Sequence, residues 1–420
     1  MKKLLLYSLL MVISKSPLAG DLDLSVSGFG HFGWVTTDES VISYKEDIAA
    51  NTSVKKGRFE SKIDSILGLQ FNATLGENLN AGAQFVLKDR FNDDDIEDYL
   101  QLAYLAFKPH AQVELRAGRL GLPAYMLSDH RDVGFAYLWD RPITEFYGVV
   151  PLRYIDGFDV TFKRRIGAGL GELVLFYGDS DATLPIEAIS HWDFKVKNFY
   201  GIVPKYEQGP WRFQLGLSRT EVDAPLPVIP TLDATFAAAR AALPPSSDAA
   251  VDALEAEYID QTNVKGVPIY YYSLGVAYDD NNWVIQSEIS RLRSEKNVLS
   301  TGHSAYLSVG RRMGSWTPYA VYSFVEPENK PFRSAVTPAF LGPFAPLTGR
   351  VEAAVNFNRS KQHSIALGAR WDIHPKASLK MQWTHSKVDK DGAALWDSGL
   401  GALPSDTSAN VYSLGLSFIF

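Results

Sequence analysis

A mixture of charged and aromatic side chains occupies residues 119–152. Its charged residues include Asp129, Arg131, Asp132, Asp140, Arg141 and Glu145, and they are interleaved with Tyr125, Phe135, Tyr137, Trp139, Phe146 and Tyr147. Carboxylates and guanidinium groups that lie near one another create a field that acts on ions and polar solutes. The aromatic rings allow the same segment to pack on another surface. What these residues do therefore depends on the elements that position them.

Residue types used in catalysis occur, but their spacing matches no catalytic motif. Neither G-x-S-x-G nor H-E-x-x-H is present, and the histidines His31, His191, His303, His363 and His385 are scattered. Ser128-Asp129-His130 has no special merit, because triads are assembled in space rather than along the chain. The absence of cysteine excludes thiol nucleophiles, thiolate metal sites and disulfides. We expect a protein that is not an enzyme.

One acidic run is a candidate for divalent cations. Asp93, Asp94 and Asp95 are followed by Glu97 and Asp98, and carboxylate oxygens suit calcium. The run lacks the spaced ligands and the glycine of a loop-type calcium site, so we interpret it as a solvated acidic loop, with a metal site as the alternative. No basic stripe or glycine-rich phosphate loop indicates nucleic acid or a nucleotide, and we expect no cofactor.

The N-terminus has the pattern of a secretory signal. Met1-Lys2-Lys3 is followed by an apolar run over residues 4–13, and cleavage is expected after Ala19 or Gly20. We predict a signal peptide over residues 1–20. Its loss takes the formal net charge from −7 to −10, because this segment holds three lysines and no acidic residue. The expected product is an acidic exported chain.

Short and long connections alternate along the remaining residues, 21–420. The short ones are predicted at residues 76–78, 109–110, 167–169, 207–210, 279–282, 313–315 and 374–376, and the long ones at 36–57, 89–96, 119–152, 178–191, 221–267, 294–302, 326–362 and 388–410. Barrels of the outer membrane alternate in this way, because short turns lie on the periplasmic side and long loops lie outside the cell. The sequence predicts an all-β, transmembrane, antiparallel up-and-down barrel of sixteen strands in one domain. Strand character at residues 350–358 leaves eighteen strands as an alternative.

Polar and apolar residues alternate with period two in the predicted strands, so each strand has one polar and one apolar face. The polar faces carry the cations Arg58, Lys62, Arg116, Arg165, Arg212, Arg312, Arg370 and Lys380. So many charges suit a water-filled lumen rather than a packed core, and the apolar faces are then expected to meet lipid. Four tryptophans next to short turns are expected to mark one membrane boundary, namely Trp211, Trp283, Trp316 and Trp371.

The closing strand, residues 411–420, carries a family resemblance. It places Tyr412, Leu414, Leu416, Phe418 and Phe420 on one face. This ending resembles the terminal strand of Gram-negative outer-membrane porins, and the signal peptide and the alternating connections extend the resemblance over the whole chain. It implies an outer-membrane homotrimer in contact with lipid, whose assembly machinery reads a signal that includes Phe418 and Phe420. It also implies that the loop after the fifth strand folds into the barrel and narrows it.

The predicted function is that of a porin through which small hydrophilic solutes and ions diffuse passively. Residues 119–152 match the narrowing loop in position and length, with an external loop as the alternative. Folded inward, the carboxylates of this loop would face some of the wall cations across a gap comparable to the Debye length, roughly 8 Å. Such a gap screens solutes by size and polarity. Arg131 and Arg141 mix positive charges into the loop, so the ion preference stays open.

The connection over residues 222–268 is long and rich in alanine. Residues 231–242 and 248–257 are good helix formers separated by Pro244-Pro245, so we predict a short helical hairpin outside the membrane. The hairpin could cover the mouth of the barrel or bind a partner.

Two rival functions remain open. The first is a substrate-selective channel in which tyrosines form a sliding track for a sugar or a similar ligand; the candidates are Tyr99, Tyr271, Tyr306 and Tyr319. The second is a blocked barrel whose external loops act in surface binding or adhesion.

Overall fold

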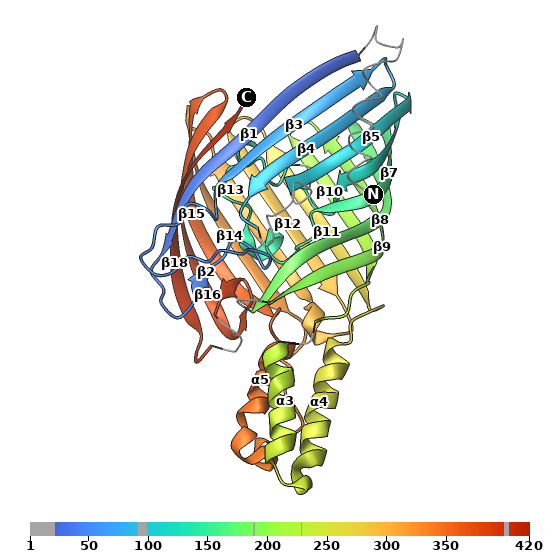
Figure 1. The fold of residues 1–420 in the computed structure, drawn as a ribbon. Helices are drawn as coiled ribbons and strands as arrows, with labels where there is room; N and C mark the ends of the chain where they lie inside the picture. Colours follow the sequence, from blue (N-terminus) through green and yellow to red (C-terminus); the bar gives the residue numbers. More distant parts are fainter. Residues whose placement is uncertain (1–21, 91–98, 129, 188–189, 228, 399–402) are drawn as a thin grey trace.

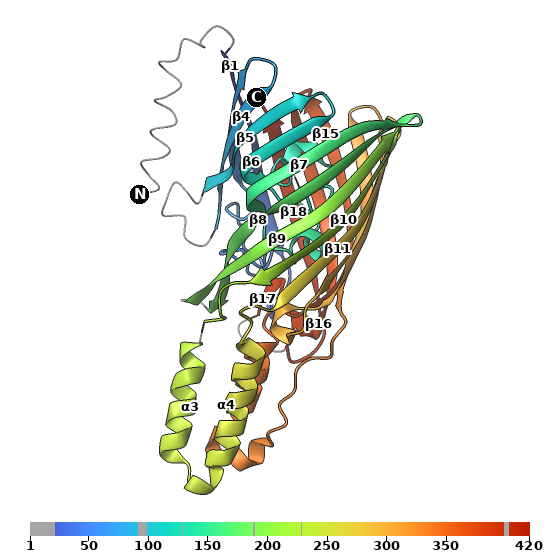
Figure 2. The same cartoon turned by 90° about the vertical axis from the view of Figure 1, so that its right-hand side faces the viewer.

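The computed structural model describes residues 22–90, 99–128, 130–187, 190–227, 229–398 and 403–420, and within these ranges sixteen antiparallel strands close into one barrel (Figures 1 and 2). The fold class predicted from the sequence is therefore confirmed. The predicted signal peptide, the acidic run at Asp93, Asp94 and Asp95, and Asp129 lie outside the described residues.

Strands β3 to β16 follow one another around the wall in chain order, and β18 and β1 complete the circle. The barrel strands are β1 (Leu22–Thr37), β3 (Ile66–Leu75), β4 (Leu79–Lys88), β5 (Leu100–His110), β6 (Val113–Gly121), β7 (Tyr154–Ile166), β8 (Gly169–Glu187), β9 (Ser190–Gln208), β10 (Trp211–Val222), β11 (Pro268–Asp279), β12 (Trp283–Arg293), β13 (Gly302–Arg311), β14 (Trp316–Pro327), β15 (Ser360–His374), β16 (Ala377–Ala393) and β18 (Thr407–Ile419). Short turns lie at one end of the barrel, at the top of Figure 1, and long connections lie at the other. We call these regions the short-turn half and the loop half.

One predicted long connection is wrong, because residues 178–191 mostly continue strands β8 and β9. Leu184 and Trp192 are buried on the inner face here, whereas Asp181 and Asp193 are exposed on the outer face. This arrangement is the reverse of a lipid-facing strand, in which the outward residues are apolar. The segment therefore does not show the alternation expected of a strand inside the membrane.

A predicted strand is also too long, because residues 58–65 belong to the loop that precedes β3. Glu60 makes an isolated bridge to Val35 of β1, and the Ser65 hydroxyl donates to the Ser61 carbonyl at 2.7 Å. Arg58 and Lys62 are exposed in this loop and are not part of the barrel wall.

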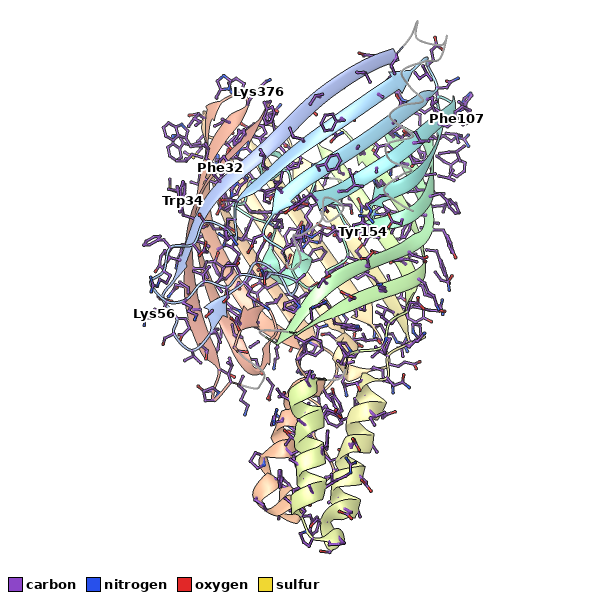
Figure 3. The ribbon with its side chains drawn as sticks, viewed as in Figure 1. Phe32, Trp34, Lys56, Phe107, Tyr154 and Lys376 are labelled. Atoms are coloured by element: carbon purple, nitrogen blue, oxygen red, sulfur yellow. The ribbon has the colours of Figure 1, made fainter. Side chains whose placement is uncertain are left out.

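The outer surface carries the aromatic residues expected of a lipid-facing wall. Phe32, Trp34 and Phe107 are exposed on it (Figure 3). The four tryptophans next to short turns are also exposed, and Trp316 and Trp371 on the neighbouring strands β14 and β15 stack with ring centroids 5.1 Å apart. The predicted aromatic boundary therefore lies at the short-turn end.

Strand β18 closes the barrel against β1. Its predicted apolar face points outward, and the rings of Phe418 and Phe420 lie over Gly30 and Gly28 of β1. A Cβ atom at Gly28 would lie 2.2 Å from the Phe420 ring, so this close approach of ring and backbone requires glycine. The closing strand is thus matched to the first strand by aromatic rings and small residues.

Three helices extend beyond the loop half (Figures 1 and 2). Helices α3 (Pro230–Ala242) and α4 (Asp248–Thr262) form the hairpin between β10 and β11, and α5 (Pro346–Val355) packs against both. The alternative of eighteen strands is wrong, because most of residues 350–358 belong to α5. Within the described ranges, no helix is both long and apolar enough to cross a membrane.

Candidate constriction of the barrel

The connection between β6 and β7 lies inside the barrel, where its short helix α2 (Thr144–Tyr147) is visible as a teal coil (Figure 1). Helix α2 contacts β12 to β15 on one side of the lumen. The single turn η3 (Gly134–Ala136) of the same connection contacts β1 and β18. The segment predicted to narrow the barrel is thus fastened to several parts of its wall.

Lys380 of β16 holds the loop by its backbone. Its ammonium group donates to the carbonyl oxygens of Gly134, Tyr137 and Trp139 at 2.5, 2.8 and 2.6 Å, and its side chain is fully buried. Arg370 of β15 adds a bond of 3.1 Å to the Tyr137 carbonyl. Of the wall cations predicted from sequence, these two are brought to the loop, but they bind its carbonyl oxygens and not its carboxylates.

Arg141 joins this constriction loop to the loop between β1 and β3. Its guanidinium group makes a bidentate pair with Asp64, at 2.5 and 3.1 Å, and also lies 3.2 Å from the Asp140 carboxylate. Burial raises the pKa of the Asp64 carboxyl to about 6; the Arg141 charge opposes this shift and the Asp140 charge adds to it. Arg141 therefore neutralises a buried acidic pair.

Asp132 belongs to a second buried network. Arg153 lies 2.9 Å from Asp132 and 2.7 Å from Asp47, and Lys88 of β4 lies 2.5 Å from Glu46 and 3.8 Å from Asp132. Burial opposes ionisation of Asp132, but the Arg153 and Lys88 charges outweigh it and hold the pKa below its usual value. The network fixes the loop to a second part of the wall, since β18, β1 and β3 lie between β16 and β4.

Glu145 on α2 is also buried and hydrogen-bonded to the wall. It accepts bonds from Ser323 at 2.8 Å, from Gln362 at 2.6 Å and from Ser364. Arg131 donates to the Tyr147 carbonyl within the loop at 2.6 Å. Those predicted constriction charges of the loop that the structure describes thus secure the loop, and they do not oppose one another across an open aqueous gap.

The remaining predicted wall cations have other partners or positions. Arg116 pairs with Asp159 of β7 at 3.0 Å, and the exposed Lys62 lies 3.4 Å from Asp89. Arg165, Arg212 and Arg312 lie near short turns, where Arg312 pairs with Asp279 at 2.8 Å. The structure does not bring these groups to the loop.

Glu288 is a functional anchor that sequence reasoning missed. This β12 carboxylate accepts bonds from the Tyr306 hydroxyl at 2.7 Å, from the Met126 backbone at 2.9 Å and from the Tyr147 hydroxyl. The available signal was a lone acidic residue on the inward face of β12. Tyr306 and Tyr319 of the proposed sliding track are buried in such contacts, since the Tyr319 hydroxyl donates to Gln382 at 2.9 Å.

A serine, a histidine and an aspartate also meet where no motif predicts it. His31 Nδ1 lies 2.8 Å from Ser417 Oγ, and its Nε2 lies 3.5 Å from Asp140 Oδ1. All three side chains are buried, and Gly134 packs so closely that a Cβ atom there would lie 3.1 Å from Ser417 Oγ. The group therefore has no room for a substrate, and the loop packs against β1 and β18 here.

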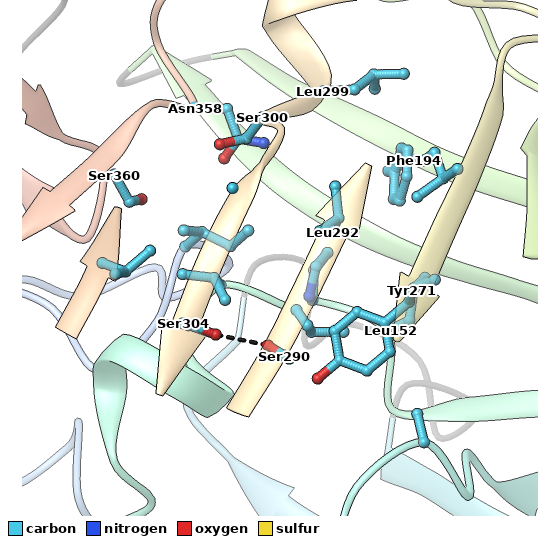
Figure 4. Close-up of a pocket in the computed structure, with 18 of the residues that line it drawn as sticks. Leu152, Phe194, Tyr271, Ser290, Leu292, Leu299, Ser300, Ser304, Asn358 and Ser360 are labelled. Atoms are coloured by element: carbon cyan, nitrogen blue, oxygen red, sulfur yellow. Dashed lines mark hydrogen bonds between the residues drawn. The ribbon is translucent and has the colours of Figure 1, made fainter. Parts of the chain in front are cut away.

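Two adjoining cavities lie between the loops and the wall in the loop half. The larger one, which we call the vestibule, has a volume of about 900 Å³ and is lined by polar and charged residues near the base of α3 and α5. The second, which we call the inner cavity, has a volume of about 100 Å³ and lies inside the barrel (Figure 4). Ile48, Leu184 and Asn358 line both, so the cavities adjoin.

The closed barrel with a loop fastened inside it has the fold of the outer-membrane porins. The chain superposes on outer-membrane-expressed OmpT of Vibrio cholerae with a TM-score of 0.52 and 11% identity, over 97% of this chain and 99% of that one. It superposes on OmpF of Salmonella typhi, solved in complex with daunomycin, with a TM-score of 0.52 and 10% identity, over 94% and 97% of the two chains. No protein-family model and no curated protein sequence matches the chain. At these identities the likeness shows the fold.

Proposed function

We propose that the protein is an outer-membrane channel through which small hydrophilic solutes and ions diffuse passively, with the constriction loop setting the size limit. The supporting observation is that this loop packs against β1 and β18 and is fastened inside the lumen to β4, β12 and β16. A loop fixed from several sides narrows a barrel without depending on a bound partner. No cofactor, energy source or catalytic step belongs to this proposal.

The short-turn half supports the proposal because its interior is polar. Glu172 of β8 lies 3.6 Å from Lys163 and 3.4 Å from Lys205, and all three side chains retain solvent exposure. Charges at the surface of an aqueous lumen replace part of the hydration of a passing solute while binding it weakly. We propose that solutes leave the constriction into this region.

Single-channel conductance in a planar bilayer tests the channel. The full chain, purified as a folded barrel, is expected to give stepwise openings, and closure in three steps would support the homotrimer that the porin resemblance implies. The matched variants are Glu145→Ala, which removes a loop anchor, and Glu221→Ala, which removes a half-buried acid at the end of β10 that pairs with Arg219. We expect Glu145→Ala to increase the conductance per channel by roughly twofold as the loop loosens, and Glu221→Ala to leave it unchanged. A barrel that inserts and never conducts would contradict the proposal and favour surface binding.

A second candidate function is a substrate-selective channel, and the inner cavity favours it. A general pore does not require an apolar recess beside its constriction. Saturation of the flux by one class of solute, with other solutes remaining linear in concentration, distinguishes this candidate from a general pore.

A further inference from the structure

The inner cavity has the size and lining of a site for one small apolar group. Its lining includes Leu152, Leu184, Phe194, Ile269, Leu292 and Val325 (Figure 4). Its volume of about 100 Å³ is of the order of the cavity in an engineered protein, about 150 Å³, that stays dry and binds benzene. A single aromatic ring is therefore the largest rigid group that suits it.

One side chain of this lining holds a buried polar atom without a partner. The indole Nε1 of Trp192 makes no hydrogen bond among the described residues. A buried donor without an acceptor is unfavourable, so a ligand that brings an acceptor would recover free energy here. The lining thus suits a ring that carries oxygen rather than a pure hydrocarbon.

The vestibule adds positive charge at the boundary of the inner cavity. Its lining has five cationic side chains, Lys45, Arg333, Arg350, Arg359 and Lys390, against three anionic ones, Glu352, Asp391 and Asp397. This excess is opposite in sign to the net charge of the whole chain, −7. Anions are therefore favoured at this mouth even though the protein is acidic.

Two of these cations lie beside the residues that separate the cavities. Arg359 is flanked by Asn358, which lines both cavities, and by Ser360, which lines the inner cavity. Lys45 lies three positions before Ile48, which also lines both. The Nε atom of Arg359 is buried and has no hydrogen-bond partner in the described part of the chain. The junction thus presents positive charge on one side and an apolar recess on the other.

We propose that this junction binds a small aromatic carboxylate, with the ring in the inner cavity and the carboxylate toward Lys45 and Arg359. The proposal rests on the second candidate function, a substrate-selective channel, and names the substrate class of that channel. A sugar suits the recess poorly, because its hydroxyl groups would lose water without gaining partners. A neutral hydrocarbon would make no use of the two cations.

Binding is tested by ligand-observed fluorine NMR on the full chain, folded in detergent micelles. The probe is 4-fluorophenylacetate; 4-fluorophenylacetamide lacks the charge, and fluoroacetate lacks the ring. We expect saturable binding of the acid, weaker binding of the amide and none of fluoroacetate. Equal binding of the acid and the amide would overturn the role of the cations, and binding of fluoroacetate would overturn the role of the ring.

Variants locate the site. Lys45→Gln and Arg359→Gln are each expected to weaken binding of the acid roughly tenfold, because a charged hydrogen bond is lost. Each should weaken binding of the amide by less than about twofold. Val325→Phe fills the inner cavity and is expected to abolish binding of both probes. Lys56→Gln, in the same external loop as Lys45 but outside the vestibule lining, is the matched control and should change nothing.

Measurements of probe binding and of conductance distinguish the proposed aromatic-acid site from the proposed channel. A barrel that conducts but binds neither aromatic probe contradicts the aromatic-acid site and leaves the channel intact. A barrel that binds the acid with the expected response to Lys45→Gln but never conducts supports the site and contradicts the channel. Because the two glutamine variants alter loop residues and leave the barrel wall unchanged, they keep the test valid if Val325→Phe fails to fold.

Discussion

Strand β8 passes through two regions of the molecule that place opposite kinds of side chain on its two faces. In the short-turn half, Glu172 is directed inward and paired with lysines, while Leu175 is exposed on the outer wall. In the loop half, Leu184 is buried inside and Asp181 is exposed outside. The same strand is therefore arranged as a membrane barrel near one end and as a soluble β-protein near the other.

This difference shows where along the barrel the outer surface changes from contact with lipid to contact with water. An apolar outer face is favourable only where lipid replaces water, and an apolar inner face only where other side chains fill the lumen. In the loop half, the constriction loop and the external loops supply that filling, for example where the ring of Tyr44 meets Trp396 with centroids 5.6 Å apart. The constriction is thus held by a hydrophobic core that the short-turn half does not have.

The largest expected effect breaks that core. Trp192→Ala removes a buried ring from the loop half, and truncation of large core residues costs about 3–5 kcal/mol of unfolding free energy. Trp211→Ala, on the outer wall in the short-turn half, is the matched control and should cost much less. Thermal unfolding of the folded barrel in detergent, followed by its gel mobility, measures both. Equal losses in the two variants would show that the loop half has no core of its own.

The next effect concerns the loop anchor at Lys380. Lys380→Met leaves three backbone carbonyls without their donor, and we expect a loss of about 3 kcal/mol together with a larger single-channel conductance as the loop moves. Lys205→Met, which removes a partly exposed lumen cation in the short-turn half, should leave stability nearly unchanged. If Lys380→Met keeps both the stability and the conductance of the parent, the loop is not held by this residue.

The two regions also differ in how far the sequence predicts them. Turn residues act locally, and so most of the alternating connections and the barrel follow from the sequence, while the inward course of the constriction loop follows from the porin resemblance. The inward direction of Lys380 follows from the period of two as well. The hydrogen-bond partners of Lys380 cannot be predicted in this way, because an inward lysine can bind either water or carbonyl oxygens until the path of the loop is known.

The contacts that the sequence does not predict are those between segments far apart in the chain. Glu288 and Tyr147 meet only after the barrel has closed around the loop, and nothing near either residue in the sequence predicts the pair. The same holds for His31 and Ser417, which lie near opposite ends of the chain and meet because β1 pairs with β18. The prediction for residues 178–191 is wrong for a different reason. Apolar residues are expected on the outer face along the whole length of every strand, whereas in this segment they lie on the inner face.

A pair of arginine substitutions on the outer face of β8 locates the boundary between the lipid-facing region and the water-facing region. Leu175→Arg places a charge on the lipid-facing wall and is expected to cost about 2–4 kcal/mol if the residue lies near the bilayer midplane. Asp181→Arg, six residues further along the same face, should change stability by about 0.5 kcal/mol or less because it faces water. Unfolding of the barrel in lipid vesicles by urea measures the pair. A large cost at Asp181 would place the membrane boundary beyond it and contradict the change of solvent along β8.

The smallest expected effect on stability is in the polar interior of the short-turn half. Lys163→Gln together with Lys205→Gln removes both cations beside Glu172, and we expect the free energy of unfolding to change by about 1 kcal/mol or less, since partly exposed ion pairs contribute little. The reversal potential across a salt gradient should nevertheless shift toward cation preference, because an uncompensated carboxylate then remains in the lumen. Matched substitutions in the loop half should reverse this ranking: Lys88→Gln breaks a buried network there and is expected to reduce stability more than it changes ion preference. A stable Lys88→Gln barrel whose ion preference shifts as strongly would mean that the Lys88 network faces the conducting water and is not part of the filled interior of the loop half.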